Sequence, residues 1–442
     1  MNWTVITLVG PNDDYKPVLD ATMPRLTVAL RRAGDVHSLG PDPIAAIVAA
    51  TGIQPSETAA DLTTVAMAAY AADLRIPRSL AEDSWTRDIT LLVPVVDSAR
   101  WESVRQRLEA FLGFLTGDRW QIEFRERAPL DQPKPPKKPK VVLEARTAAC
   151  LFSGGLDSLV GVLDLLSTGA PLALVGHHGA GVTNPVQQNV LAGLRKTFSP
   201  LMREFMFYVQ PPKDHTAGET SMRSRSVLFL ALGIAVASVA GAGARLVVAE
   251  NGLISLNVPL TNARIGSSST RTTHPHVMAA LRDLLAALGI LVEIDLPYRF
   301  QTKGEMLQHV QARDALVELA PLSASCSHPE VGRYRGNTPG THCGYCVPCI
   351  IRRASLNAAG MDHGSYDVDI LANPPAADSE TSRDPRAFQM AIARLRGATF
   401  SQTLAAVAST GPLPPRDMEQ YARVYRRGMN EVSQLLGLGS LL

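Results

Sequence analysis

The sequence predicts an α/β protein built around a doubly wound parallel sheet, and three observations lead to this expectation. Short apolar runs alternate along the chain with stretches that repeat apolar residues every three or four positions, as strands followed by helices do. Two adjacent glycines end one of these runs at residues 154–155. Polar residues directly follow several runs, where the carboxyl ends of parallel strands form a ligand crevice.

The length of 442 residues is typical of two or three domains. Hydrophobic residues make up 46% of the chain and charged residues 19%, which is typical of a globular protein. The formal net charge of +2 gives no general case for a nucleic-acid partner. We find neither a signal peptide nor an apolar stretch of membrane-spanning length, and we expect a cytoplasmic protein without a membrane partner.

Residues 1–126 are expected to form an N-terminal α+β domain. Its strands are predicted at 3–9, 88–95 and 121–125, and its helices at about 18–33, 59–74 and 101–115. All four tryptophans of the chain fall in this range, which favours a core separate from the rest. The domain contains no catalytic motif, and we expect it to dock a protein partner.

A segment rich in proline and lysine follows over residues 127–140. Proline at this density cannot continue a helix or a central strand, so we expect an extended, semi-rigid linker. Its four lysines indicate either a nucleic-acid contact or a solvated spacer, and we prefer the spacer.

Residues 141–362 are expected to contain the doubly wound sheet. Its strands are predicted at 148–152, 172–176, 204–209, 245–249 and 291–296, with helices at 156–163, 184–198 and 225–242. The polar residues beyond the strand ends are the segment 153–158, His177, Glu250, Asn251 and Lys303. Because the carboxyl ends of parallel strands meet at one edge of a sheet, we expect these residues to share one site.

The segment 153–158, with the sequence SGGLDS, joins the first of these strands to a helix. The two glycines allow backbone N–H groups to turn toward an anion at the helix N-terminus. The serine hydroxyls add donors, and Asp157 can hold a metal ion or orient a nucleotide. The segment is not a Walker loop, because no Lys-Ser/Thr pair follows the glycines. A structural turn is the alternative interpretation.

This string resembles the pyrophosphate-binding loop of the PP-loop ATP pyrophosphatases, whose pattern SGGxDS it matches at every fixed position. The resemblance implies that ATP and Mg²⁺ bind here and that an oxygen of the substrate attacks the α phosphorus with release of pyrophosphate. With the strand-end rule, we assign cofactor binding to Ser153, Gly154, Gly155, Leu156, Asp157, Ser158, His177 and Asn251.

Two further stretches near the strand ends are candidates for substrate contacts. Arg225 begins an apolar helix, where it either binds a phosphate or carboxylate or is an exposed basic residue. The polar stretch 260–276 is either a lid over the site or disordered surface, and we prefer the lid. We assign catalytic roles to Asp157, Lys303 and Arg225, and substrate binding to Glu250, Arg264, Arg271 and His274.

Four of the five cysteines, Cys326, Cys343, Cys346 and Cys349, lie close together in the sequence. In a cytoplasmic protein such a cluster favours metal binding over disulfides. Four thiolates without an open position fit structural Zn²⁺, and an iron–sulfur cluster is the alternative. The remaining Cys150 is expected to be a buried core thiol.

Together the two motifs resemble those of the 7-cyano-7-deazaguanine synthases, the QueC family. The pattern S-C-(16 residues)-C-G-x-C-x-x-C-x-x-R runs from Ser325 to Arg352, and the resemblance covers about 147–362. It extends to Arg225 and to the pair Thr302-Lys303, whereas residues 177–179, 224–226 and 250–252 depart from the family pattern. The resemblance implies a C–N ligase that adenylates 7-carboxy-7-deazaguanine, forms an amide or nitrile, and keeps a structural zinc.

The added N-terminal domain and a tail over 363–442 are more similar to the QueC-like proteins of bacterial antiviral defence systems, such as the Qat operons. This similarity implies that the activated deazaguanine is joined to a partner protein encoded nearby. We also consider a homodimer, in which two copies of this chain associate. The tail is expected to contain helices at about 385–396 and 415–436. Tyr421, Tyr425, Arg426 and Arg427 form either a partner face or one side of an ordinary amphipathic helix.

Other functions with the same loop are less consistent with this chain. Amide-forming synthetases that draw ammonia from an attached glutaminase need a cysteine nucleophile, and residues 1–149 contain none. Transfer-RNA thiolases need redox-active cysteines, whereas four of the five here belong to the cluster. A module that only binds nucleotides is expected to have lost loop residues. A different PP-loop enzyme, tRNA-modifying or amide-forming, remains the alternative function.

Overall fold

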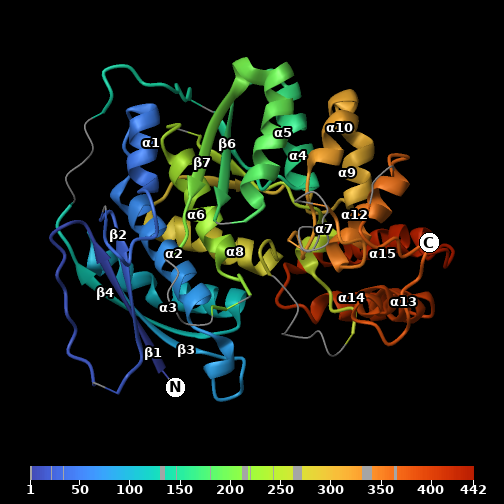
Figure 1. Cartoon of the computed structure of the whole chain (residues 1–442), viewed down its shortest axis with the longest axis horizontal. Helices are drawn as coiled ribbons and strands as arrows, with labels where there is room; N and C mark the ends of the chain where they lie inside the picture. Colours follow the sequence, from blue (N-terminus) through green and yellow to red (C-terminus); the bar gives the residue numbers. More distant parts are fainter. Residues whose placement is uncertain are drawn as a thin grey trace.

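The structure is a computed structural model of the chain. It describes residues 2–20, 22–32, 34–129, 135–145, 147–179, 181–211, 218–219, 221–241, 243–261, 271–330, 341–362 and 366–442. The strands in this part form two sheets, of four and five strands. In Figure 1 the four-stranded sheet lies at the left, the five-stranded sheet at the centre and the helical tail at the right.

The N-terminal sheet has the order β2-β1-β3-β4, and all its neighbouring strands are parallel. Its strands are β1 (Asn2–Val9), β2 (Arg25–Leu30), β3 (Asp88–Val95) and β4 (Arg119–Glu126). The connecting helices are α1 (Pro43–Thr51), α2 (Glu57–Arg75) and α3 (Ser98–Thr116). The expectation of an α+β domain is therefore wrong, because parallel strands joined by helices form an α/β unit.

The error comes from residues 18–33, where we expected a helix and the structure has β2. A short apolar run fits both a strand and a buried helix, and here the pairing with β1 decides between them. Pro24 within the expected helix was a signal against it. Helix α1 was missed although Asp42 caps its first turn, Pro43 begins it and Gly52 ends it, as is common at helix ends.

The second sheet has the order β7-β6-β5-β8-β9 and is parallel throughout. Its strands are β5 (Ala148–Leu151), β6 (Leu172–His178), β7 (Met202–Tyr208), β8 (Arg245–Val247) and β9 (Glu293–Asp295). Its helices include α4 (Leu156–Ser167), α5 (Thr183–Phe198), α6 (Arg225–Ser238) and α8 (Pro275–Leu288). All five strands lie where the sequence predicts them.

Helices cover both faces of this second sheet. Cys150 of β5 belongs to a core cluster that includes side chains of α4 and α5. The neighbouring Ala149 and Leu151 belong to another cluster with α6 and α8. This alternation is what a strand buried on both faces requires, and the central sheet is doubly wound as expected.

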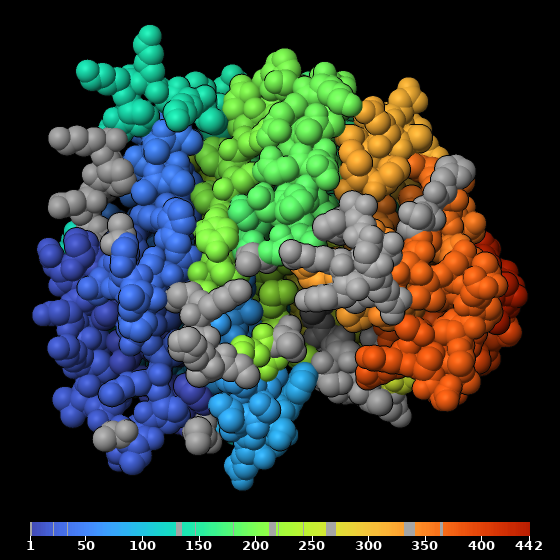
Figure 2. Space-filling view, viewed as in Figure 1, coloured from blue at the N-terminus to red at the C-terminus, as the bar shows by residue number. Residues whose placement is uncertain are grey.

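The two sheets share a core. Helix α2 packs against α6, and α3 packs against α8. One cluster of buried side chains runs from Val5 of β1, through α2 and α6, to Leu246 of β8. Figure 2 shows the blue N-terminal unit in contact with the green central part on the face that is drawn. The separate core expected from the tryptophans is therefore wrong, since Trp101 and Trp120 belong to the shared cluster.

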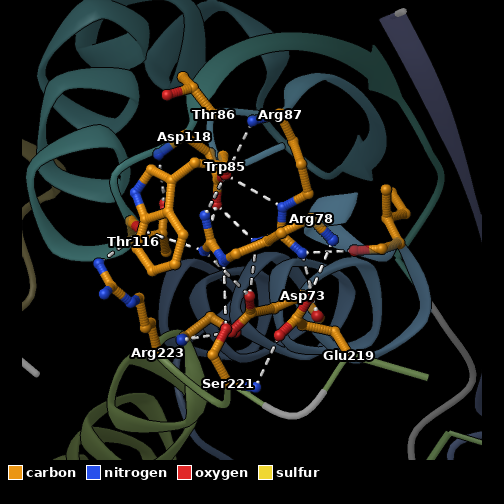
Figure 3. Close-up of polar contacts among 12 residues, drawn as sticks. Asp73, Arg78, Trp85, Thr86, Arg87, Thr116, Asp118, Glu219, Ser221 and Arg223 are labelled. Atoms are coloured by element: carbon orange, nitrogen blue, oxygen red, sulfur yellow. Dashed lines mark hydrogen bonds and ion pairs between the residues drawn. The ribbon is translucent and has the colours of Figure 1, made fainter. Parts of the chain in front are cut away.

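A cluster of buried charges lies at this contact between the units (Figure 3). The Arg87 side chain is 1% exposed, and its Nη2 lies 2.6 Å from Asp73 Oδ1 and 2.6 Å from Asp118 Oδ2. Arg78 Nη1 donates to Asp118 at 2.9 Å. Asp73 Oδ2 accepts from the backbone N–H and the hydroxyl of Ser224, each at 2.8 Å. The cluster therefore joins the end of α2 to the start of α6.

The C-terminal part is helical and packs on the second unit. It contains α13 (Arg383–Arg396), α14 (Phe400–Ala408) and α15 (Met418–Leu435), and the second unit also contains α7 (Gly252–Leu256), α9 (Lys303–His309), α10 (Arg313–Leu319) and α12 (Val347–Ala358). Helix α14 was not predicted. Tyr421 and Tyr425 are 2% and 4% exposed in a core with α7 and α12, so the amphipathic interpretation of α15 is the correct one.

Short 3₁₀ turns lie at Arg78–Leu80, Ser199–Leu201, Ala320–Leu322, Glu380–Ser382 and Pro415–Asp417. The described parts of the expected linker, 127–129 and 135–140, contain neither a helix nor a strand. Within the described residues, no helix combines the length and the apolar character needed to cross a membrane.

We predict that Asp118→Asn destabilises the protein by about 3–5 kcal/mol, because it leaves two buried guanidiniums with one carboxylate. Asp88→Asn is the control, since its ion pair with Arg119 is solvent-exposed and should be worth about 0–1 kcal/mol. The measurement is urea unfolding of both variants beside the unchanged chain. Equal unfolding midpoints for the two variants would show that the buried cluster contributes little.

Candidate active site

The SGGLDS segment follows β5, the strand at which the order of the second sheet reverses. Gly154 has a φ of 80°, in the left-handed region that glycine adopts readily. Ser153 Oγ accepts from the N–H of Gly155 at 3.2 Å and lies 3.2 Å from Ser158 Oγ. Ser158 Oγ donates to the carbonyl of Gly155 at 2.9 Å. Both serine hydroxyls therefore lie beside the Gly155 backbone, at the N-terminus of α4.

The loop is held from outside by residues next to the cysteine cluster. The N–H of Ala324 donates to the Gly154 carbonyl at 3.0 Å, and Ser325 Oγ accepts from the N–H of Leu156 at 3.3 Å. A Cβ on Gly155 would lie 3.3 Å from the Ala324 carbonyl oxygen, so a larger residue would strain this contact. Ser325 was part of the family pattern but was not predicted to touch the loop.

Asp157, in the first turn of α4, meets two other predicted site residues. Its Oδ2 accepts from Asn251 Nδ2 at 2.7 Å, and its Oδ1 lies 3.2 Å from Lys303 Nζ. The Lys303 side chain is 6% exposed and that of Asp157 is 13% exposed, so this ion pair is largely shielded from water. The structure thus brings together residues that follow β5, β8 and β9, as the strand-end rule predicts.

Glu250 is the neighbouring acid. Burial raises its pKa to about 7, and the charge of Asp157 acts in the same direction. The hydrogen bond from Thr273 and the charge of Lys303 oppose this increase but do not cancel it. A carboxyl group with a raised pKa therefore lies near a second carboxyl group and one lysine, an arrangement common in enzyme sites.

His177 and Arg225 lie against each other. His177 is 1% exposed; its Nε2 donates to the Val209 carbonyl at 3.1 Å, and its Nδ1 accepts from Arg225 Nε at 3.4 Å. Burial and the charge of Arg225 lower the pKa of His177 to about 3, so the ring is neutral. Both ring nitrogens have protein partners in this structure, so no ring nitrogen of His177 is left for a hydrogen bond to the nucleotide.

Two of the three substrate residues predicted in the 260–276 stretch are described by the structure, and both make contacts within the protein. His274 caps α8 and donates from Nε2 to Thr410 Oγ1 at 2.9 Å, and burial lowers its pKa to about 3. Arg271 donates to the Phe114 carbonyl at 2.9 Å and lies over the Phe114 ring. These polar atoms contact α3 and the tail. Arg264 and the middle of the expected lid, 262–270, lie outside the described residues.

The four clustered cysteines form a compact set of sulfur atoms. Their Sγ atoms, from Cys326, Cys343, Cys346 and Cys349, all lie within 4.8 Å of one another. The Cys343–Cys349 and Cys326–Cys346 pairs are 3.8 and 3.9 Å apart. A tetrahedral ion with Zn–S bonds of ~2.3 Å needs sulfurs ~3.8 Å apart, whereas a disulfide needs ~2.05 Å. The cluster could therefore hold a metal ion such as zinc.

Two other cysteine features fit the sequence. The N–H groups of Ser327 and His328 point to cluster sulfurs, at 3.4 Å from Cys346 Sγ and 3.3 Å from Cys326 Sγ, which favours thiolates. Cys150 is fully buried, and burial raises its pKa to about 12, as expected for a core thiol. The cluster is thus the chain's candidate metal centre among the described residues.

Sequence reasoning missed a residue that supports Lys303. Glu431 of α15 accepts from Thr302 Oγ1 and from the N–H of Gly304, so one carboxylate binds the residues on both sides of Lys303. Beside it, Arg427 Nε lies 2.6 Å from Glu305. Burial raises the pKa of Glu431 to about 7. An acid within the apolar face of a tail helix was the only sequence signal for this contact.

No protein-family model matches the chain, and no curated protein is significantly similar to it. The functional argument therefore depends on the geometry of the site and on the two motifs.

We predict one zinc ion per chain, measured by elemental analysis, and its loss in Cys346→Ser. Since metal binding and folding are coupled, this variant should also loosen residues 324–326 and the loop beside them. Cys150→Ala, at a buried thiol outside the cluster, should keep the zinc. Iron with visible absorbance in anaerobically purified protein would contradict the assignment.

We predict that Glu431→Leu destabilises the protein by about 1–3 kcal/mol, because the donors of Thr302 and Gly304 lose their acceptor. Glu431→Gln should behave differently, since its single amide oxygen can still accept from one of the two donors, which bond to different carboxylate oxygens. The raised pKa of Glu431 means that its stabilising contribution is complete below about pH 4.5 and is lost as the pH rises through about 7.

The Gln variant should therefore be less stable than the unchanged chain at pH 5, where one donor lacks its acceptor, and should gain stability relative to that chain at pH 8, in thermal unfolding at both values. Glu419→Gln is the control, because Glu419 is exposed on the same helix. An equal stability difference between the Gln variant and the unchanged chain at pH 5 and at pH 8 would contradict the assigned role.

Proposed function

We propose that the protein is an ATP-dependent ligase that adenylates a carboxylate and releases pyrophosphate. One observation carries this proposal: the SGGLDS loop lies where the strand order of the second sheet reverses, with Asp157 between Asn251 and Lys303. An anion-binding loop, a carboxylate and a lysine at one crevice are the groups that phosphoryl-type transfer from ATP requires.

The loop residues have separate roles in this proposal. The N–H of Gly154 and the hydroxyls of Ser153 and Ser158 bind the β and γ phosphates, and the N–H groups of Gly155 and Leu156 exchange their serine acceptors for phosphate oxygens when ATP binds. Asp157 is the carboxylate that would hold Mg²⁺, which neutralises phosphate charge when bound. Lys303 offsets the charge that develops as the substrate carboxylate attacks the α phosphorus and the bond to the β phosphate breaks. An amine then attacks the acyl carbon, loses a proton and displaces AMP.

We propose 7-carboxy-7-deazaguanine as the carboxylate. The combined loop and cysteine pattern supports this choice, as does Glu250 beside Asp157. A carboxylate can accept from both the ring N–H and the amino group of a guanine-type edge, which makes Glu250 the group for purine recognition. The cysteine cluster holds zinc and acts structurally, because its neighbours Ala324 and Ser325 fix the loop.

We propose that the amine comes from a partner protein in antiviral defence, with ammonia and a nitrile product as the alternative. The first unit shares a core with the second, so a protein bound to it would be held near the adenylate at a high effective concentration. Deleting this unit would expose the shared core, and the conjugation is therefore tested with the full chain.

We predict AMP and pyrophosphate from ATP, Mg²⁺, 7-carboxy-7-deazaguanine and an amine, supplied as ammonia or by a neighbouring gene product, with a loss of about 100-fold or more in Asp157→Asn and Lys303→Met. Asp164→Asn is the matched control on α4, since Asp164 bonds to Tyr298 rather than to the loop. Release of ADP and phosphate would contradict the mechanism.

Mass spectrometry of the same reaction distinguishes the products. A deazaguanine adduct on a neighbouring gene product supports conjugation, whereas efficient nitrile formation with ammonia alone would show that conjugation is not the function.

A further inference from the structure

Gln187 is a polar side chain in the apolar face of helix α5. This helix lies beside α4 in Figure 1, and side chains of both helices share a core with β5 and β6. Gln187 is 0% exposed, and the other buried residues of α5 are apolar: Val186, Val190, Leu191 and Leu194. Burial of a carboxamide is unfavourable unless its hydrogen bonds are made, so its contacts indicate why it is there.

The Gln187 carboxamide joins the ends of two strands. Pairing between β5 and β6 ends at Leu151 and Val175, followed by one hydrogen bond from the Phe152 N–H to the Val175 carbonyl. Beyond this bond, Gln187 Nε2 donates to the Phe152 carbonyl at 3.1 Å and to the His177 carbonyl at 3.4 Å. One amide group thus continues the connection between the strands at the point where the chain enters the SGGLDS loop.

The stem of the same side chain supports the loop. A Cβ on Gly154 would lie 3.2 Å from Gln187 Cγ, so this left-handed glycine lies directly against Gln187. Phe152 and Gly154, the residues on both sides of Ser153, therefore both contact Gln187. Ser153 is the first residue of the loop, and its backbone can move little while both contacts are kept.

The His177 carbonyl extends this arrangement to α6. It accepts from Gln187 Nε2 and also from Arg225 Nη2, the latter at 3.3 Å. Arg225 is the first residue of α6, so one carbonyl oxygen connects the carboxyl end of β6 with the start of that helix. Loss of the Gln187 amide would therefore disturb the loop and this junction together.

The amide of Gln187 has only acceptors as neighbours. Both of its partners are carbonyl oxygens, which the NH₂ end of a carboxamide can contact and the oxygen end cannot. Gln187 Oε1 is buried and has no hydrogen-bond partner among the described residues. A leucine or methionine would fill the position without a buried, unpartnered acceptor. The two donors are therefore the property that distinguishes glutamine at this position.

We propose that Gln187 is a positioning residue for the SGGLDS loop. It holds the carboxyl ends of β5 and β6 at a fixed separation, so that Ser153 and Gly154 are in place for the phosphates of ATP. Gln187 contacts no phosphate itself, because it is fully buried. The identity of the ligand rests on the proposed function, whereas the effect of Gln187 on the loop does not.

The first test is hydrogen–deuterium exchange of the full chain without nucleotide. Gln187→Met keeps most of the side-chain volume and removes both donors, so backbone amides at 152–156 should exchange faster by about tenfold or more. Amides of α15 should keep their rates, which distinguishes a displaced loop from a less stable protein. Gln188→Met is the matched control, since Gln188 is the next residue of α5 and is only partly buried. Unchanged exchange at 152–156, or an equal increase throughout the chain, would overturn the proposal.

The second test is the steady-state rate of adenylation in Gln187→Glu, which keeps the shape of the side chain. A carboxylate cannot donate, so KM for ATP should rise by about tenfold or more at pH 8, while KM for the amine stays the same. At pH 6 the difference from the unchanged chain should narrow, because burial favours a protonated carboxyl, which can donate one hydrogen bond. Gln188→Glu should change neither constant.

The outcomes distinguish this role from the proposed function. A lower kcat with an unchanged KM for ATP in Gln187→Glu would mean that Gln187 only stabilises the fold, and would overturn its positioning role. An unchanged chain that forms no AMP and pyrophosphate would contradict the proposed function. Faster exchange at 152–156 in Gln187→Met would still support the role of Gln187 in that case.

Discussion

A guanidinium buried between two carboxylates determines how the parts of this protein fit together. Arg87 directly precedes β3, Asp118 directly precedes β4, and Asp73 lies near the end of α2. The same Asp73 carboxylate binds Ser224, the residue before α6, so one cluster sets both the N-terminal sheet and the entry to a helix of the second sheet (Figure 3). Buried charges need such complete pairing, which makes this contact specific in position.

The candidate site after β5 depends on contacts from three distant parts of the chain. The segment before Cys326 binds the glycine loop, Glu431 of the tail binds the residues around Lys303, and Arg225 supports His177 at the end of β6. None of these contacts involves a reacting group directly. The cysteine cluster and the tail helix therefore belong to the architecture of the site, and an isolated sheet would not keep the same geometry.

Features encoded in short stretches could be predicted from the sequence, and features that depend on distant neighbours could not. The strand–loop–helix at 148–167, the meeting of Asp157 with Asn251 and Lys303, and the cysteine cluster follow from local patterns and the strand-end rule. Strand β2 was missed because its apolar run fits two periodicities. The partners of His177, and the Glu431 carboxylate that binds the residues beside Lys303, come from segments 32 or more residues away. A short window of sequence does not contain both members of such a contact.

Helix α2 lies between the two sheets, and its residues 59–74 are all buried, so it has no solvent-facing side in that span. Its many alanines allow close approach on every side. Asp61 in its early part binds Arg127, which directly follows β4, and Asp73 near its end binds Arg87 at the contact with α6. These carboxylates are separated by ~18 Å of helix and point ~120° apart. The helix thus fixes both the spacing and the relative direction of the two carboxylates. Adding or removing one residue between them would turn one carboxylate by ~100° relative to the other.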